Sequence, residues 1–192
     1  MSKHLHFHHV TKRFGAQTVL LDFSLELPLS CVSCLMGPSG SGKTTLLNLL
    51  MGLVQPDSGS VQTIHPQSAV FQEDRLLPQL SALGNLRLIT GGGKDAELLH
   101  LLAELGIGEE GHKPVRDFSG GMQRRVVIAR ALIAEYELLL LDEPFKGLDA
   151  DTRARTAEVI RRASQGKTVV MVTHDPTEAA LLNAQVFWLP AI

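Results

Sequence analysis

The chain has 192 residues, of which 44% are hydrophobic, and its formal net charge is -2 at pH 7. This length and apolar content suit one compact α/β unit and exclude a disordered chain. The charge provides no basic surface of the kind that binds nucleic acid, and no apolar run approaches the roughly 20 residues that span a bilayer. The start of the chain leads into no apolar signal segment, so we expect a cytoplasmic protein.

The first thirty residues predict an antiparallel β layer. Residues 4–9 alternate in a way that favours a strand with three histidines on one face: His4, His6 and His8. A metal site on that face is the alternative to ordinary strand histidines. A second strand is predicted from Thr18 to Leu29, with one side formed by Leu21, Phe23, Leu25 and Leu27.

Two cysteines form a C-x-x-C pattern at Cys31 and Cys34. Redox or zinc chemistry is the functional interpretation of this pattern. On a strand, however, residues three apart face opposite sides and lie about 10 Å apart, whereas a disulfide needs Cα atoms within about 7 Å. We therefore expect buried thiols.

The segment Gly37–Thr44 fits G-x-x-x-x-G-K-[ST], the phosphate-binding loop called Walker A. A short apolar run precedes the loop and a leucine-rich helical pattern follows it, which is the context that this motif requires. Glycines permit the left-handed turns that point backbone N–H groups inward, and the helix N-terminus adds partial positive charge. We expect Lys43 to reach the β- and γ-phosphates and the Thr44 hydroxyl to bind Mg²⁺. The expected phosphate contacts are Gly37, Pro38, Ser39, Gly40, Ser41, Gly42, Lys43, Thr44 and Thr45.

The middle of the chain is predicted to be a helical insertion. Short strands are expected at 60–64 and 68–71, and from residue 73 to about 120 the composition becomes leucine-rich and helical. Residues 94–105 form an amphipathic pattern that ends before Gly106, a C-cap candidate. Ser119 is a candidate N-cap for the next helix, which is expected to continue through Ala134.

Three polar sites follow apolar strands: Gln72, the pair Asp142-Glu143, and His174. Ligands of parallel α/β sheets bind beyond the C-terminal strand ends, where the phosphate loop also lies. These residues are therefore predicted to converge near the γ-phosphate. We expect Asp142 to help hold Mg²⁺, Glu143 to polarise the attacking water, and His174 to sense or stabilise the γ-phosphate.

The order of these motifs resembles the nucleotide-binding subunits of ATP-binding cassette (ABC) transporters over nearly the whole chain. Beside Walker A, the resemblance rests on the Q-loop at Gln72, the signature at 118–122, Walker B at 138–143, the D-loop at 147–149 and the switch histidine His174. It implies a P-loop NTPase (RecA-like) α/β fold with a parallel-sheet core (1–72 and 121–192), an N-terminal antiparallel β layer and an inserted helical subdomain (73–120).

The resemblance also implies partners and further site residues. Two copies would sandwich two ATPs head to tail, and each signature would contact the other copy's γ-phosphate through Ser119, Gly120 and Gly121. The resemblance implies nucleotide contacts from Asp149, catalytic roles for Gln72, Lys43, Glu143 and His174, and Mg²⁺ ligation by Thr44, Gln72 and Asp142. Phe14 occupies the position of the adenine-stacking aromatic; the alternative is an ordinary core phenylalanine.

The resemblance further implies ATP hydrolysis that powers import through a separate membrane permease, at the cytoplasmic face of the membrane. An extracytoplasmic solute-binding protein would act through the permease, and no nucleic acid is expected. The signature departs from the usual L-S-G-G-Q and reads Phe118-Ser119-Gly120-Gly121-Met122, which is similar to importers of nitrate, sulfonates and taurine.

Two other classes are alternatives: a soluble ABC ATPase that acts on DNA or ribosomes, and a nonhydrolysing, ATP-gated scaffold. DNA-repair members carry long coiled coils between Walker A and the signature, and ribosome-acting members carry two cassettes; this chain has neither feature. The intact Glu143 and His174 argue against the scaffold.

Overall fold

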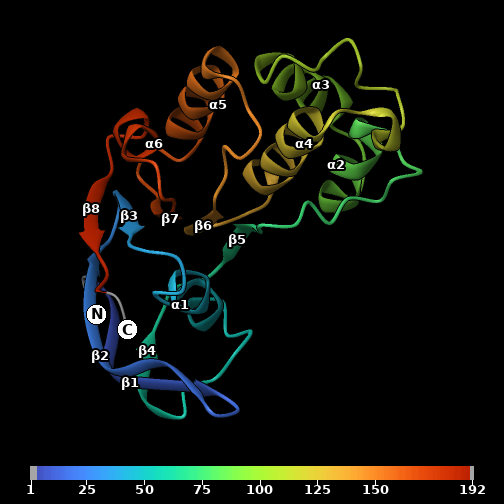
Figure 1. Ribbon diagram of the computed structural model, residues 1–192. Helices are drawn as coiled ribbons and strands as arrows, with labels where there is room; N and C mark the ends of the chain where they lie inside the picture. The colour runs from blue at the N-terminus through green and yellow to red at the C-terminus, as the bar shows by residue number, and fades with distance from the viewer. Residues whose placement is uncertain (1–3, 191–192) are drawn as a thin grey trace.

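The computed structural model describes residues 4–190, which form two sheets and their covering helices (Figure 1). The first sheet is antiparallel, with the strand order β2-β1-β4. Its strands are β1 (His4–Phe14), β2 (Gln17–Pro28) and β4 (Ser58–Gln62). The predicted antiparallel layer is thus confirmed, and β4 completes it from beyond the phosphate loop.

The second sheet is parallel, with the strand order β5-β6-β7-β3-β8. Its strands are β3 (Val32–Met36), β5 (Gln67–Val70), β6 (Leu138–Asp142), β7 (Thr168–Val172) and β8 (Gln185–Trp188). Every residue of β6 and β7 is buried, because helices or strands cover both faces of the sheet. The predicted parallel-sheet core is confirmed.

Helices cover the two faces of the parallel sheet. One face packs with α1 (Lys43–Leu50) and the antiparallel sheet, and the other packs with α4 (Gly120–Ile133), α5 (Ala150–Ala163) and α6 (Pro176–Leu181). The helices α2 (Ala82–Thr90) and α3 (Asp95–Glu104) and the 3₁₀ turn η1 (Val115–Asp117) lie between β5 and α4 in the chain. Figure 1 shows α2 and α3 beside α4, away from the antiparallel sheet. None of the helices within residues 4–190 has the length and apolarity needed to cross a membrane.

The inserted helices have a hydrophobic core of their own, which they share with α4. Leu83 and Leu86 of α2 and Leu98 and Leu102 of α3 are buried there together with Val126 of α4. The expected end of α3 is confirmed, since Gly106 follows it with a φ of +73°. This segment is a helical insertion into the α/β fold, while the limits at 73 and 120 stay predictions.

The predicted face of the second strand is wrong in one place. Leu20 is 2% exposed and Leu21 is 67% exposed, although Phe23 and Leu27 pack inward as expected. Asp22, which lies between Leu21 and Phe23, has a φ of +49°, and the pairing of β1 with β2 shifts register in this part of the two strands. An extra residue of this kind reverses the alternation, and a period of two in the sequence does not reveal it.

Of the two cysteines, Cys34 lies on β3 as expected, whereas Cys31 precedes β3 and is half-buried, so the expectation of buried thiols is confirmed for Cys34 alone. Cys34 is fully buried in β3, and burial raises the pKa of its thiol to about 12, so this group stays protonated. On β1, the rings of His6 and His8 lie 5.5 Å apart and His6 contacts Glu26. Within residues 4–190 no group of three His, Cys, Asp or Glu side chains is placed to hold a metal ion.

Candidate nucleotide site

The phosphate loop connects β3 to α1 and depends on its glycines. Gly40 and Gly42 have φ values of +85° and +83°, a region that residues with a Cβ rarely adopt. A Cβ at Gly37 would lie 2.9 Å from both Leu189 O and Ser41 Oγ. The loop is therefore tightly folded, and both the loop and the N-terminus of α1 line one cavity, which is described below.

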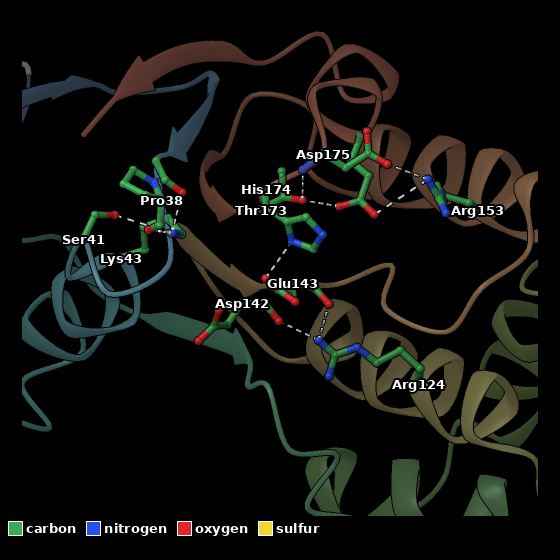
Figure 2. A network of polar contacts seen from close by, with 12 residues as sticks. Pro38, Ser41, Lys43, Arg124, Asp142, Glu143, Arg153, Thr173, His174 and Asp175 are labelled. Atoms are coloured by element: carbon green, nitrogen blue, oxygen red, sulfur yellow. Dashed lines mark hydrogen bonds and ion pairs between the residues drawn. The ribbon is translucent and has the colours of Figure 1, made fainter. Parts of the chain in front are cut away.

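Lys43 projects from the first turn of α1 back across the loop. Its Nζ donates to Gly37 O at 2.8 Å and to Pro38 O at 2.7 Å (Figure 2). The ammonium group is thus held at the loop by carbonyl groups, which places a positive charge beside the backbone amides of the cradle.

A cavity of about 490 Å³ opens beside this loop. Its lining brings together predicted residues from the phosphate loop, the Q-loop, the end of Walker B and the switch histidine. These residues are Gly37, Ser39, Gly40, Gly42, Lys43, Thr44, Thr45, Gln72, Asp142, Glu143 and His174. Gln17, Val19 and Val172 also line it, and no motif in the sequence pointed to them. Pro38 and Ser41 belong to the loop without lining the cavity, although Ser41 Oγ lies 3.5 Å from Lys43 Nζ.

Asp142 ends β6 and is only 6% exposed. Burial raises the pKa of its carboxyl group, while a hydrogen bond from Thr44 and the nearby charges of Arg124 and Lys43 act in the opposite direction. A buried carboxylate beside a hydroxyl is a set of hard oxygen donors, the kind that Mg²⁺ prefers.

Glu143 follows with an unusual backbone. Its φ is +45°, and its amide donates to Val172 O at 2.9 Å. Its carboxylate Oε1 lies 3.0 Å from His174 Nδ1 (Figure 2). Glu143 and His174 come from the ends of the neighbouring strands β6 and β7. The expected convergence of these residues at one sheet edge is therefore present.

Several polar residues that support the site were missed by sequence reasoning. Thr173 Oγ1 donates to the buried carboxylate of Glu178, and Arg153 of α5 pairs with Asp175 at 2.9 Å. Burial raises the pKa of Glu178, and hydrogen bonding from Thr173 opposes this effect. The only signal in the sequence was the clustering of Glu178 and Asp175 near His174, which does not identify the distant partner Arg153.

The signature and the D-loop lie outside the Walker A cavity. Ser119 caps α4 by accepting from Met122 N at 3.3 Å, and Asp149 caps α5 by accepting from Thr152 N at 3.0 Å. Both residues line a separate hollow of about 840 Å³, together with Gly120 and Gly121. The chain therefore does not bring its own signature to its own phosphate loop.

Phe14 ends β1 with 49% of its surface exposed, and Lys12 Nζ lies 5.3 Å from the ring centroid. The alternative of a core phenylalanine is wrong. The ring is outside the set of residues that line the phosphate cavity.

Comparisons with known proteins agree with this geometry. Residues 20–146 match the family model described as ABC transporter. The aliphatic sulfonates import ATP-binding protein SsuB 3 of Rhodococcus jostii is 42% identical, over 94% of this chain and 69% of its own length. The Fe(3+) ions import ATP-binding protein FbpC of Agrobacterium fabrum is 41% identical, over 94% of this chain and 56% of its own length.

A solved dimeric structure of MJ0796, a bacterial ABC transporter cassette, is similar with a TM-score of 0.85 and 28% identity, over 96% of this chain and 94% of that one. The sequence match and the shared fold lead to one conclusion. The chain belongs to the ABC transporter family and is one of its ATP-binding, ATP-hydrolysing cassettes.

Proposed function

We propose that this cassette hydrolyses Mg-ATP to power the import of a solute through a separate membrane permease. The observation that carries the proposal is the single cavity in which Lys43, Thr44, Gln72, Asp142 and Glu143 meet. The import direction is supported by the relatives, which are named as import ATP-binding proteins for aliphatic sulfonates and Fe(3+) ions.

Mg²⁺ fits the donors of the cavity. Thr44, Gln72 and Asp142 supply a hydroxyl, an amide and a carboxylate group, and all three line the same space. When bound, the ion would neutralise charge on the β- and γ-phosphates. Lys43 and the backbone N–H groups of the phosphate loop would bind the same phosphates.

Glu143 is the proposed general base. Its carboxylate group lines the phosphate cavity and lies 3.0 Å from His174 Nδ1, a contact that fixes the direction of the side chain. His174 completes the site by holding Glu143 and by facing the γ-phosphate. Phe14, exposed at the end of β1, stacks on adenine in this proposal.

The signature acts on a second copy of the chain. Ser119, Gly120, Gly121 and Asp149 lie in a hollow distinct from the phosphate cavity, so they contribute to catalysis only across a head-to-tail dimer. The dimeric structure of the similar cassette supports this arrangement. ATP binding closes the dimer, and hydrolysis with product release reopens it.

The helical insertion, residues 73–120 in our division, and Gln72 transmit this motion to the permease at the cytoplasmic face of the membrane. Exposed Leu77, Leu88 and Ile89 give this segment apolar surface for such a contact. A solute-binding protein on the far side of the membrane would deliver the solute, and we expect no nucleic-acid partner.

Co-expression with the permease encoded beside it tests the proposal. The cassette should sediment with membranes only when the permease is present, and its ATPase rate should respond to the permease. A cassette that stays soluble, with an ATPase rate indifferent to every neighbouring permease, contradicts the importer assignment and favours a soluble role.

A further inference from the structure

Arg124 is a charged side chain in the interior of the protein. It lies on α4, five residues after the signature serine, and is 3% exposed. Its guanidinium group donates to four carbonyl oxygens and one carboxylate oxygen, which come from two separate segments. The acceptors are Phe71 O, Asp74 Oδ1 at 3.0 Å, Asp142 O at 2.6 Å, Glu143 O at 2.8 Å and Pro144 O at 3.1 Å.

One of the two segments, residues 142–144, contains the proposed general base Glu143. Glu143 has a left-handed backbone, which is costly for a residue with a Cβ and persists only when surrounding contacts hold it. Its amide donates to Val172 O. Its carbonyl accepts from Arg124 Nη2 and its side chain contacts His174 (Figure 2). Arg124 therefore supplies one of the contacts that set the direction of this carboxylate.

The other segment, residues 71–74, contains Gln72, a proposed Mg²⁺ ligand. Arg124 Nη1 contacts the residue before it, Phe71, and the residue two after it, Asp74. Arg130, on the same helix, donates to Arg75 O at 2.8 Å. The helix α4 thus holds the segment that carries Gln72 at two points.

Arginine suits this place for a physical reason. Its planar group has five donors in a fixed fork, whereas lysine has three donors on a single nitrogen atom that cannot span both segments. An apolar residue would leave the carbonyls of Asp142, Glu143 and Pro144 without this donor. Among the described residues, Asp74 is the carboxylate that forms an ion pair with Arg124, and it is only part-buried.

We propose that Arg124 is a positioning residue for ATP hydrolysis, which holds Glu143 and the Gln72 segment in one fixed relation through its bonds to 142–144 and to Phe71 and Asp74. The inference rests on the proposed roles of Glu143 and Gln72. Arg124 is outside the lining of its own chain's phosphate cavity and lines the signature hollow instead, so the nucleotide affinity of the isolated cassette and its turnover should separate.

The test compares Arg124→Lys, Asp74→Asn, the double variant and the control Arg162→Gln. Arg162 also pairs with a distant carboxylate, Glu104, and it lines neither the phosphate cavity nor the signature hollow. We measure kcat and KM for ATP, the affinity for a fluorescent ATP analogue, and the melting temperature of each protein. Glu143→Gln is assayed in parallel.

Arg124→Lys should lower kcat by roughly ten- to a hundredfold, which corresponds to one or two strong hydrogen bonds, with affinity for the analogue within about twofold. Asp74→Asn should lower kcat by about threefold or more. Its effect should be smaller in the Arg124→Lys background, because the two side chains act as a unit. Arg162→Gln should leave kcat unchanged.

Wild-type kcat in both Arg124→Lys and Asp74→Asn, with Glu143→Gln inactive, would overturn the positioning role alone. Normal turnover by Glu143→Gln would instead remove the proposed base. If Arg124→Lys has a lower melting temperature but an unchanged kcat at temperatures below that melting temperature, the role of Arg124 is merely structural and the proposal is overturned. If Arg124→Lys does not fold, Asp74→Asn decides, and unchanged kcat in that variant overturns the proposal.

Discussion

Glu143 Oε1 and His174 Nδ1 lie 3.0 Å apart and join the ends of two adjacent parallel strands. When Glu143 acts as a carboxylate it can only accept hydrogen bonds, and the proton of this contact then lies on Nδ1. The imidazole thereby fixes the direction of the carboxylate, and the carboxylate fixes the tautomer of the imidazole. This mutual arrangement is what a base and its orienting residue require.

Replacing Glu143 by Gln keeps the size of the side chain and removes the base. Hydrolysis should fall by about 10²–10⁴-fold, the usual effect of losing a general base. Affinity for ATP should persist, because Lys43, Thr44 and the loop amides are unchanged. Phosphate release under saturating Mg-ATP measures the rate, with Glu158→Gln on the surface of α5 as the matched control. Normal hydrolysis in the variant would be incompatible with the role of Glu143.

Lys43→Ala should weaken ATP binding. The change removes a charge-assisted contact of about 1.5–3 kcal/mol, which is roughly ten- to a hundredfold in affinity. Titration with a fluorescent ATP analogue measures this loss. Lys167→Ala, which removes a lysine paired with Glu137 away from the cavity, should bind normally. Equal affinity in the Lys43→Ala variant and the wild type would refute the phosphate contact.

Ser119→Arg should abolish the ATP-dependent dimer. The substitution places a long side chain at the N-terminus of α4, in the hollow where the other copy's γ-phosphate is proposed to bind. In a Glu143→Gln background, gel filtration with Mg-ATP should show a dimer, and adding Ser119→Arg should leave a monomer.

Loss of the Ser119 cap costs about 1 kcal/mol by itself, so Ser81→Ala, which removes the equivalent cap of α2, is the control for helix stability. The Ser81→Ala protein should still dimerise. A dimer that is indifferent to Ser119→Arg argues against a signature that acts across two subunits.

Glu178→Gln should make stability less dependent on pH. Burial raises the pKa of Glu178 above its usual value of 4.5, so the folded protein holds this proton more tightly than the unfolded chain. The corresponding stability is fully present below pH 4.5 and is lost as the pH rises through the folded-state pKa. The melting temperature of Glu178→Gln minus that of the wild type should therefore rise between pH 4.5 and neutrality. A flat difference would show that the two states bind this proton equally well.

Much of the site follows from local patterns. Walker A was predictable because the glycine loop between a strand and a helix is encoded by consecutive residues of the chain. Asp142, Glu143 and His174 were predictable because buried strands are continuous apolar runs, and the residues that follow them meet at one sheet edge. The exposure of Leu21 was not predictable, because the irregularity at Asp22 comes from pairing with β1.

The sequence alone thus determined the order of the elements, the phosphate loop and the polar residues at the strand ends, since each depends on neighbours along the chain. Only the tertiary structure decided which distant side chains support them. The bonds of Arg124 to Asp74, 50 residues away, and to Glu143, 19 residues away, depend on how α4 packs against β5 and β6. The separation of the signature hollow from the phosphate cavity likewise arises from the placement of α4 and α5, which no local pattern encodes.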